Sequence, residues 1–529
     1  MPHVRIFSKY RLTRGGLGAV SGLLAAFAAL AVAEVVAAVV RPQAGPVLAV
    51  GGAAIDRTPA VVKDWAIRSF GADDKLVLQV GILVILGALA VVLGLLALRH
   101  RGSGALAVLL FGVVGTAAAL TRPDTRGALD ALPSVAGAVA GALLLYVLIG
   151  RLPAASGPRP DAGEAPGWDR RGFLVAAAAA AAASTAAGAL GRRLASSSGE
   201  EAVASRAAVT LPVPASPAAP VPRGAGLRVP GVSSFITPTE DFYRVDTALV
   251  VPKVDATRWR LRVHGKGVPT ELDLTFRDLL RRDLIERDIT LTCVSNEVGG
   301  PYVGNARWIG VRLHDLLRLA GVRPPSQGGL ADQLVSRSVD GMTIGTPVED
   351  VMDGRDAMLA VGMNGEPLPL AHGFPVRMVV PGLYGYVSAC KWIQDIELTT
   401  FDAYDPYWVK RNWAREAPIK TQARIDTPRP FARPEAGPVM VAGIAWAQHR
   451  GIDRVEIRVD DGPWQDADLA AQASPDTWRL WSWSWDAAPG THTLTVRATD
   501  GTGQVQTDRR ARTIPDGASG RHSVVVTVD

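Results

Sequence analysis

Four long apolar runs in the first 150 residues constrain this chain more than any other feature. They cover residues 17–40, 76–98, 103–120 and 132–150. A helix of about 20 residues crosses the roughly 30 Å hydrocarbon core of a bilayer, and each run approaches or exceeds that length. Helices buried in a soluble domain are the alternative, but four such runs in succession favour a membrane module. The remaining sequence is more polar, so the 529-residue chain as a whole is only 48% hydrophobic.

Basic residues flank the apolar runs in a pattern that predicts their orientation. Three clusters lie before the first run, between the second and third, and after the fourth: Arg5, Lys9, Arg11 and Arg14; Arg99 and Arg101; Arg151 and Arg159. In a four-helix topology all three fall on one side, which the positive-inside rule assigns to the cytoplasm. The loop over residues 41–75 then faces outward despite a few basic residues. Because the net charge of +6 comes largely from these arginines, it does not indicate nucleic-acid binding.

A fifth apolar segment, residues 172–190, follows Trp168-Asp169-Arg170-Arg171-Gly172-Phe173-Leu174-Val175. It resembles a bacterial twin-arginine export signal, although its internal position departs from the usual N-terminal one. An ordinary transmembrane helix with two chance arginines is the alternative. Cleavage behind the segment would discard the four preceding helices, so we expect a retained fifth helix. Either way, residues 1–192 form a module of the bacterial cell membrane, and the chain beyond it is extracytoplasmic.

Two further regions follow the membrane module. Residues 193–230 are rich in serine, alanine and proline, which predicts an extended linker. Residues 231–425 mix short strands with short helices, an α+β pattern. Within this domain Thr275 is a predicted helix N-cap, and Gly321 is predicted to end the helix that begins near Leu313.

Residues 426–529 have the composition of an all-β domain. Strands are predicted at 438–446, 455–459, 478–485, 491–498 and 503–507. Their spacing of about ten residues, with turn residues between them, is typical of an immunoglobulin-like β-sandwich. Tryptophans 481, 483 and 485 alternate and share one face, which is more consistent with the core than with an interface.

One of only two cysteines in the chain lies where a ligand can be approached closely. Residues 289–311 read ITLTCVSNEVGGPYVGNARWIGV, so Cys293 ends a short alternating strand and precedes a glycine-rich loop. A lone cysteine in such a strand is commonly a small buried hydrophobe. A thiolate is also a ligand for a soft metal centre. The chain has no CxxC or HExxH motif, so neither zinc nor an iron–sulfur cluster is suggested.

A second motif narrows these alternatives. Residues 362–392 read GMNGEPLPLAHGFPVRMVVPGLYGYVSACKW. Together with the cysteine segment, this stretch resembles the sulfite oxidase family of molybdopterin-dependent oxidoreductases, over about residues 232–425. The resemblance implies the sulfite oxidase fold and a molybdenum–molybdopterin cofactor. It also implies that the C-terminal β domain serves dimerisation, so a homodimer is a possible state.

The resemblance assigns roles to particular residues. It implies that Cys293 is the molybdenum ligand, and that His372 and Arg377 hold the pterin and its phosphate. Further cofactor-binding candidates are Phe242, Tyr243, Arg244, Asp246, Asp340, Ala389, Cys390 and Lys391. The family has an Asn-His pair where this chain has Val245-Asp246, so the pterin contacts of that pair are open. Cys390 on its own is more consistent with a packed apolar residue. Arg244 and Arg450 are, with Cys293, the candidate catalytic residues, as cations for an anionic substrate.

The implied reaction is two-electron oxygen-atom transfer at molybdenum, but the substrate pocket departs from that of sulfite oxidases. Val298 stands where the family has an arginine, and Ile344 lies nearest the position of a pocket tyrosine. Sulfite is therefore one candidate substrate, and a sulfoxide such as oxidised methionine is another. The chain has no CxxCH haem motif, so electrons are expected to pass to or from a separate cytochrome or quinone-linked partner.

Two readings from other functional classes compete with an enzyme. One is an inert surface binding or assembly module that kept the fold and lost turnover, which retention of Cys293, His372 and Arg377 disfavours. The other is a transporter with a fused domain. The apolar runs contain almost no charged residues, which disfavours a transport pathway.

Overall fold

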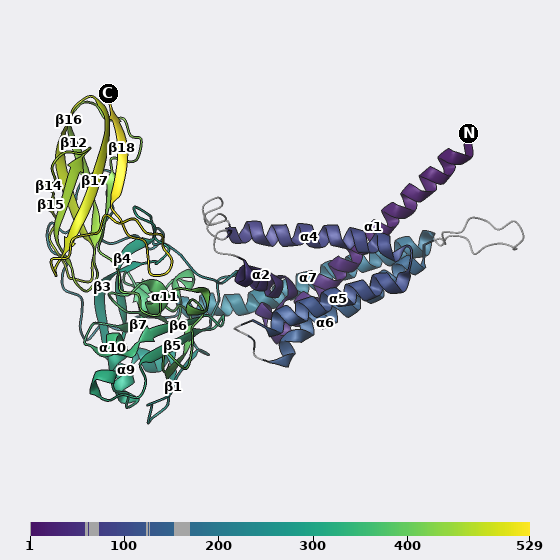
Figure 1. Cartoon of the computed structure of the whole chain (residues 1–529). Coiled ribbons are helices and arrows are strands. Elements are labelled where there is room, and N and C mark those ends of the chain that lie inside the picture. Colours follow the sequence, from purple (N-terminus) through teal and green to yellow (C-terminus); the bar gives the residue numbers. More distant parts are fainter. Residues whose placement is uncertain (1, 59–61, 63–73, 123–124, 126, 153–169) are drawn as a thin grey trace, which may run out of the picture. The chain divides into compact units, whose positions relative to one another are not determined.

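The computed structural model describes residues 2–58, 62, 74–122, 125, 127–152 and 170–529 (Figure 1). The chain divides into two compact units. The first comprises residues up to Glu200 together with Ala248–Val250, and the second comprises Glu201–Thr247 and Val251–Asp529. Arg159, Trp168 and Asp169, which belong to the predicted flanking and twin-arginine patterns, lie outside the described residues.

The first unit is helical. Its helices are α1 (Pro2–Val40), α2 (Pro46–Arg57), α4 (Asp74–Ala97), α5 (Arg101–Leu120), α6 (Leu132–Gly150) and the first part of α7 (Arg170–Ala207). Five candidate spans in the described part of the chain are long and apolar enough to cross a membrane, at Thr13–Val40, Leu76–Ala97, Arg101–Leu120, Ala128–Gly150 and Arg171–Ala207. These helices are therefore compatible with membrane insertion.

Glycines allow helices α1 and α4 to pack with their backbones in close contact. A Cβ atom on Gly22 would overlap the carbonyl oxygen of Ala90, and one on Gly94 would overlap that of Gly18. Small residues spaced four apart favour close helix association where no hydrophobic effect separates helix from lipid. A buried ion pair joins Arg41, directly after α1, to Asp130, shortly before α6, at 2.6 Å.

Helix α7 corrects the predicted linker. The prediction placed residues 193–230 in an extended spacer, but α7 continues to Ala207. Residues 193–207 contain four alanines and four serines but no proline, and alanine has the highest helix propensity. The last turn of α7 and the coil that follows it are both held by other residues of the second unit. Arg206 donates through Nε to the carbonyl oxygen of Leu368 at 2.8 Å, and Ser216 forms a parallel bridge with Ile285.

The second unit contains two β-sheets before the C-terminal region, with short helices between their strands. One sheet has the order β2-β1-β10-β5-β6, and the other has the order β3-β4-β7-β8 with β9 paired to β7. The strands are β1 (Arg260–Gly265), β2 (Leu272–Thr275), β3 (Leu284–Thr292), β4 (Val303–Arg312), β5 (Gln333–Ser338), β6 (Thr343–Pro347), β7 (Met358–Met363), β8 (Glu366–Pro367), β9 (Arg377–Val379) and β10 (Ile393–Thr399). The helices are α8 (Phe276–Leu280), α9 (Leu313–Leu319), α10 (Val348–Met352) and α11 (Gly385–Ser388).

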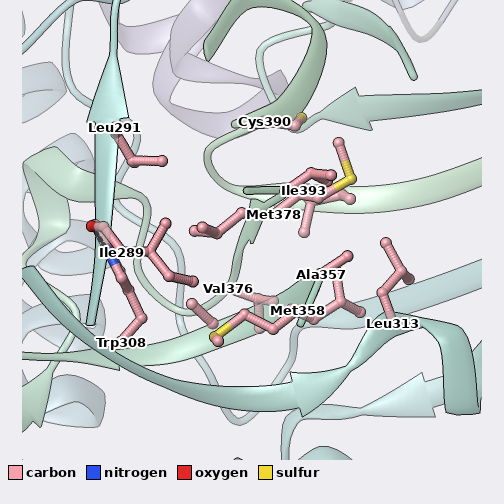
Figure 2. Packing of buried hydrophobic residues seen from close by; sticks show 14 of the residues in the cluster. Ile289, Leu291, Trp308, Leu313, Ala357, Met358, Val376, Met378, Cys390 and Ile393 are labelled. Carbon is pink, nitrogen blue, oxygen red and sulfur yellow. Dashed lines mark hydrogen bonds between the residues drawn. The ribbon is translucent and has the colours of Figure 1, made fainter. Parts of the chain in front are cut away.

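Local signals predicted the helix ends in this domain correctly. Thr275 caps α8 in a capping box, because its side chain accepts from the amide of Asp278 and the Asp278 carboxylate accepts in return. Gly321 follows α9 with φ of +80°, a conformation that favours glycine. The core of the domain is one apolar cluster, and Figure 2 shows Ile289 and Leu291 entering it from β3.

The C-terminal region forms two four-stranded antiparallel sheets, ordered β11-β12-β16-β15 and β14-β13-β17-β18. The strands are β11 (Gln422–Thr427), β12 (Gly437–Trp446), β13 (Ile452–Val459), β14 (Gln465–Asp466), β15 (Asp468–Leu469), β16 (Arg479–Ala487), β17 (Gly490–Asp500) and β18 (His522–Val528). We call this region the β module. Residues of both sheets, Trp481 and Trp485 among them, share one core.

One predicted strand of the β module is wrong. Residues 503–507 form only an isolated bridge between Thr499 and Val505, and the strand at the end of the chain is β18 instead. Gly503 has φ of +83°, which is incompatible with an extended strand, and the Gln506 side chain is buried and hydrogen-bonded to the carbonyl oxygen of Gly520. This segment is therefore a turn fastened by side-chain hydrogen bonds.

Candidate functional site

Strand β3 and the loop behind it position the thiol of Cys293. Ile289 and Leu291 face the domain core, and Cys293 is the first residue after the strand. Its amide donates to the carbonyl oxygen of Tyr302 at 3.0 Å, and its Sγ accepts from the amide of Ser295 at 3.4 Å. The residue is 8% exposed, and burial raises the pKa of the thiol above its usual range. Without a bound metal the thiol is therefore protonated at neutral pH.

The loop from residue 294 to residue 302 is closed by side-chain contacts rather than left open. The Asn296 carboxamide oxygen accepts from the amide of Tyr302 at 2.8 Å. A Cβ atom on Gly300 would lie 2.6 Å from that same oxygen, so only glycine fits there without a shift. The glycines that the sequence placed in this loop thus permit tight closure beside the thiol.

Arg377, at the start of β9, is a buried cation whose charge is not balanced by an ion pair. The residue is 5% exposed, and its Nη1 donates to the carbonyl oxygen of His372 at 3.3 Å. Its guanidinium lies over the ring of Trp308, with 4.9 Å between guanidinium carbon and ring centre. Its Nε has no hydrogen-bond partner, and within the described ranges no carboxylate pairs with it. Burial lowers the pKa of Arg377 to about 10.

Two more cations gather beside His372. The Lys391 ammonium lies 2.8 Å from Oδ2 of Asp246, and Nε of Arg244 lies 3.4 Å from the same oxygen. Burial, followed by the charges of Arg377, Lys391 and Arg244, lowers the pKa of His372 to about 4, so the imidazole is neutral at pH 7. Asp246 thus lies beside Lys391 and Arg244, whereas Arg377 has no carboxylate partner among the described residues, and the cluster favours an anionic group.

Aromatic rings line the same cluster. Phe242 stacks on Tyr243 with ring centres 5.2 Å apart, and its ring is perpendicular to those of His372 and Trp308, with centres 5.7 Å apart in each pair. The segment from Phe242 to Asp246 therefore lies with the second motif, as the resemblance implied. Trp308 is a member of the site that the sequence did not single out, because its place under Arg377 depends on the pairing of β4 and β9 with the same strand, β7.

Four other candidates contact groups outside the residues described above. Cys390 packs in the apolar core, and burial raises its pKa to about 12 (Figure 2). Asp340 accepts from the amide of Met342 in the β5–β6 turn, and the amide of Ala389 donates to Gly385. Arg450, expected as a substrate cation, instead pairs with the buried carboxylate of Asp500 at 2.9 Å and donates to the Ile419 carbonyl at 2.7 Å.

Comparison with known proteins identifies the family. Residues 248–408 match the family model described as "Oxidoreductase molybdopterin binding domain". Sulfite oxidase from Gallus gallus is 31% identical over 320 residues, which cover 52% of this chain and 68% of that protein. Mitochondrial sulfite oxidase from Rattus norvegicus is 30% identical over 289 residues, which cover 47% of this chain and 52% of that protein. The chain thus spans about half the length of this mammalian relative.

Among solved structures, the sulfane dehydrogenase SoxCD from Paracoccus pantotrophus is 26% identical with a TM-score of 0.48, over 56% of this chain and 83% of that one. The sequence relatives show that the chain belongs to the sulfite oxidase family of molybdopterin-binding oxidoreductases. It is an oxidoreductase that depends on a molybdenum cofactor. The buried Arg377, with its unpartnered Nε, fits the anionic phosphate of such a cofactor.

Because the charge of Arg377 is unbalanced, removing it should have opposite effects on the stability of the cofactor-free chain and on cofactor binding. Without cofactor, a buried guanidinium lacking a counter-ion costs free energy. We therefore expect Arg377→Met to raise the free energy of unfolding of the cofactor-free chain by at least about 1 kcal/mol. The same variant should lose most of its bound molybdenum. Denaturant unfolding and metal analysis by mass spectrometry measure the two effects.

Arg307 supplies the control, because its Nε is already paired with Asp288 at 2.8 Å. Arg307→Met should lower the stability of the cofactor-free chain. A destabilised Arg377→Met variant that keeps its molybdenum would contradict the assignment of Arg377 to an anion site.

Proposed function

We propose that this chain is a membrane-anchored oxidoreductase that transfers oxygen atoms at a molybdenum ion ligated by Cys293. The observation that carries the proposal is the juxtaposition of a buried thiol with a cationic cluster. Lys391 lies near enough to act on both the Cys293 thiol and His372 electrostatically. When bound, the cofactor supplies two-electron oxygen-atom transfer.

The residues of the chain have separable roles in this proposal. Cys293 binds the metal as a thiolate, and the metal displaces the proton that burial otherwise retains. Arg377 and Lys391 neutralise the phosphate and fix the pterin, while neutral His372 offers a hydrogen-bonding ring. Phe242 and Tyr243 provide the aromatic wall. Arg244, with 43% of its side chain exposed, is the cation best placed to meet an anionic substrate.

Two substrates remain in view, each favoured by a different observation. The relatives named sulfite oxidase favour sulfite. The pocket composition favours a sulfoxide, because Val298 and Ile344 replace a cation and a phenol, and Arg450 is neutralised by Asp500. A lost charged hydrogen bond weakens binding of a dianion by about 1–3 kcal/mol.

Anaerobic visible spectroscopy of the molybdenum-loaded full chain distinguishes the two. If sulfite is the substrate, adding it will bleach the thiolate-to-molybdenum absorption, because sulfite reduces the metal. If a sulfoxide is the substrate, sulfite will leave the oxidised spectrum unchanged, and methionine sulfoxide will restore the absorption of the dithionite-reduced protein. Failure of both reagents in a sample that contains molybdenum would contradict the proposed reaction and favour an inert binding or assembly module.

The proposal extends to location and assembly. The five apolar helices anchor the chain in a bacterial membrane as a multi-pass module, and the twin-arginine-like segment that leads into α7 favours a catalytic domain outside the cytoplasm. The two sheets of the β module are consistent with an immunoglobulin-like sandwich that supports a homodimer. A separate cytochrome or quinone-linked protein accepts or donates the electrons.

Cysteine labelling in intact cells tests the orientation, since both native cysteines are buried. Gln327 on the molybdopterin domain and Ser103 at the start of α5 are both exposed. A membrane-impermeant maleimide should label Gln327→Cys in intact spheroplasts and Ser103→Cys only after lysis. The reverse pattern would place the catalytic domain in the cytoplasm.

A further inference from the structure

The last four residues of the strand that leads to Cys293, 289–292, are buried on both faces, and different groups fill the two faces. Ile289 and Leu291 enter the core of the molybdopterin domain. Thr290 and Thr292 point the opposite way, as alternation along a strand requires, yet each is only 1% exposed. Asn305 of β4 covers part of this face, because its Oδ1 accepts from Oγ1 of Thr290 at 3.0 Å, and groups of the β module supply further partners.

Gln448 makes the most direct of these contacts. It lies in the turn between β12 and β13 and is fully buried at 0% exposure. Its Nε2 donates to the carbonyl oxygen of Thr290 at 3.0 Å and to Oγ1 of Thr292 at 2.9 Å. One side-chain amide of the β module therefore binds both a backbone carbonyl and a side-chain hydroxyl in the last three residues of the strand before Cys293.

Two neighbours of Gln448 in the β module hold the same strand. The amide of Thr290 donates to the carbonyl oxygen of Asp476 at 2.9 Å, and the amide of Trp478 donates to Oγ1 of Thr290 at 2.7 Å. The strand thus has fixed hydrogen-bond partners on this face. Among them, Gln448 binds Thr292, the residue directly before Cys293.

The loop behind Cys293 is held from the same module. Arg424, on β11, donates from Nη1 to the carbonyl oxygen of Gly300 at 2.8 Å. Gly299 has φ of +80°, and a Cβ atom there would overlap the ring of His522. The segments before and after the thiol are therefore both fastened to the β module.

We propose that Gln448 is a positioning residue that orients the Cys293 thiol toward the metal. This inference rests on the proposed function, in which Cys293 ligates molybdenum. The β module then does more than extend the chain or join two copies, because it supplies the outer hydrogen bonds that set the direction of a metal ligand. Loss of such outer partners typically lowers metal affinity or activity by about 10–100-fold.

A matched pair of isosteric variants tests the proposal in the loaded full chain. Gln333 is also fully buried, its Nε2 likewise donates two hydrogen bonds, to Thr400 and Tyr404, and neither glutamine has a partner for its Oε1. Gln448→Met should shift the thiolate-to-molybdenum absorption and lower turnover by about 10–100-fold. Gln333→Met should lose comparable thermal stability but keep the wild-type absorption.

An unchanged absorption band and turnover in Gln448→Met would overturn the proposal, and so would an equal shift in Gln333→Met, which would indicate general loosening.

A second readout does not need the metal and separates this inference from the proposed function. In cofactor-free full chain, iodoacetamide labelling of Cys293 is followed by mass spectrometry, with the more deeply buried Cys390 as internal reference. Gln448→Met should raise the labelling rate of Cys293 relative to Cys390 several-fold, and Gln333→Met should not. An unchanged ratio overturns the positioning role. If Cys293→Ser leaves the molybdenum absorption intact, the ligand assignment fails, and the labelling ratio still decides whether Gln448 orients the thiol.

Discussion

The last four residues of strand β3, 289–292, have no solvent face, and this constraint organises the site around Cys293. Because side chains alternate, the two faces of this segment require two separate sets of partners. The apolar set lies in the molybdopterin domain around Ile289 and Leu291, and the polar set lies in the β module around Gln448. Displacing the polar set would leave buried polar groups of Thr290 and Thr292 without partners, at a cost of about 1–3 kcal/mol for each unsatisfied group.

The cationic cluster, in contrast, contains a buried polar group without a hydrogen-bond partner. The strand is fully satisfied by protein groups, whereas Arg377 keeps a buried charge with an unpartnered Nε. Trp308 offers its ring face to the guanidinium, and the neutral His372 adds no charge of its own. A protein that leaves one cation underpaired in its interior is prepared for an anion that arrives with a ligand, and the phosphate of a molybdenum cofactor meets that requirement.

The sequence predicted those features whose causes are local. The capping box at Thr275, the helix end at Gly321 and the alternation into Cys293 each depend on a few neighbouring residues. The grouping of Phe242 with His372 and Lys391 followed from the family resemblance, since Phe242 lies more than 100 positions before the other two. Arg450 was placed as a free cation because its partner, Asp500, lies on another strand. Gln448 and Trp308 carried no signal, because their roles exist only once β12 and β4 have packed. The linker prediction was wrong over residues 193–207, which contain no proline and continue α7, whereas the proline-rich residues after them are coil.

The most direct test of the central claim is X-ray absorption at the molybdenum edge, on the loaded full chain and on Cys293→Ser. We predict that the wild-type protein contains molybdenum and that its metal has one more sulfur ligand than the metal of the variant. An identical sulfur shell in the two proteins, or a wild-type protein that takes up no molybdenum, would contradict the assignment of Cys293 as the metal ligand.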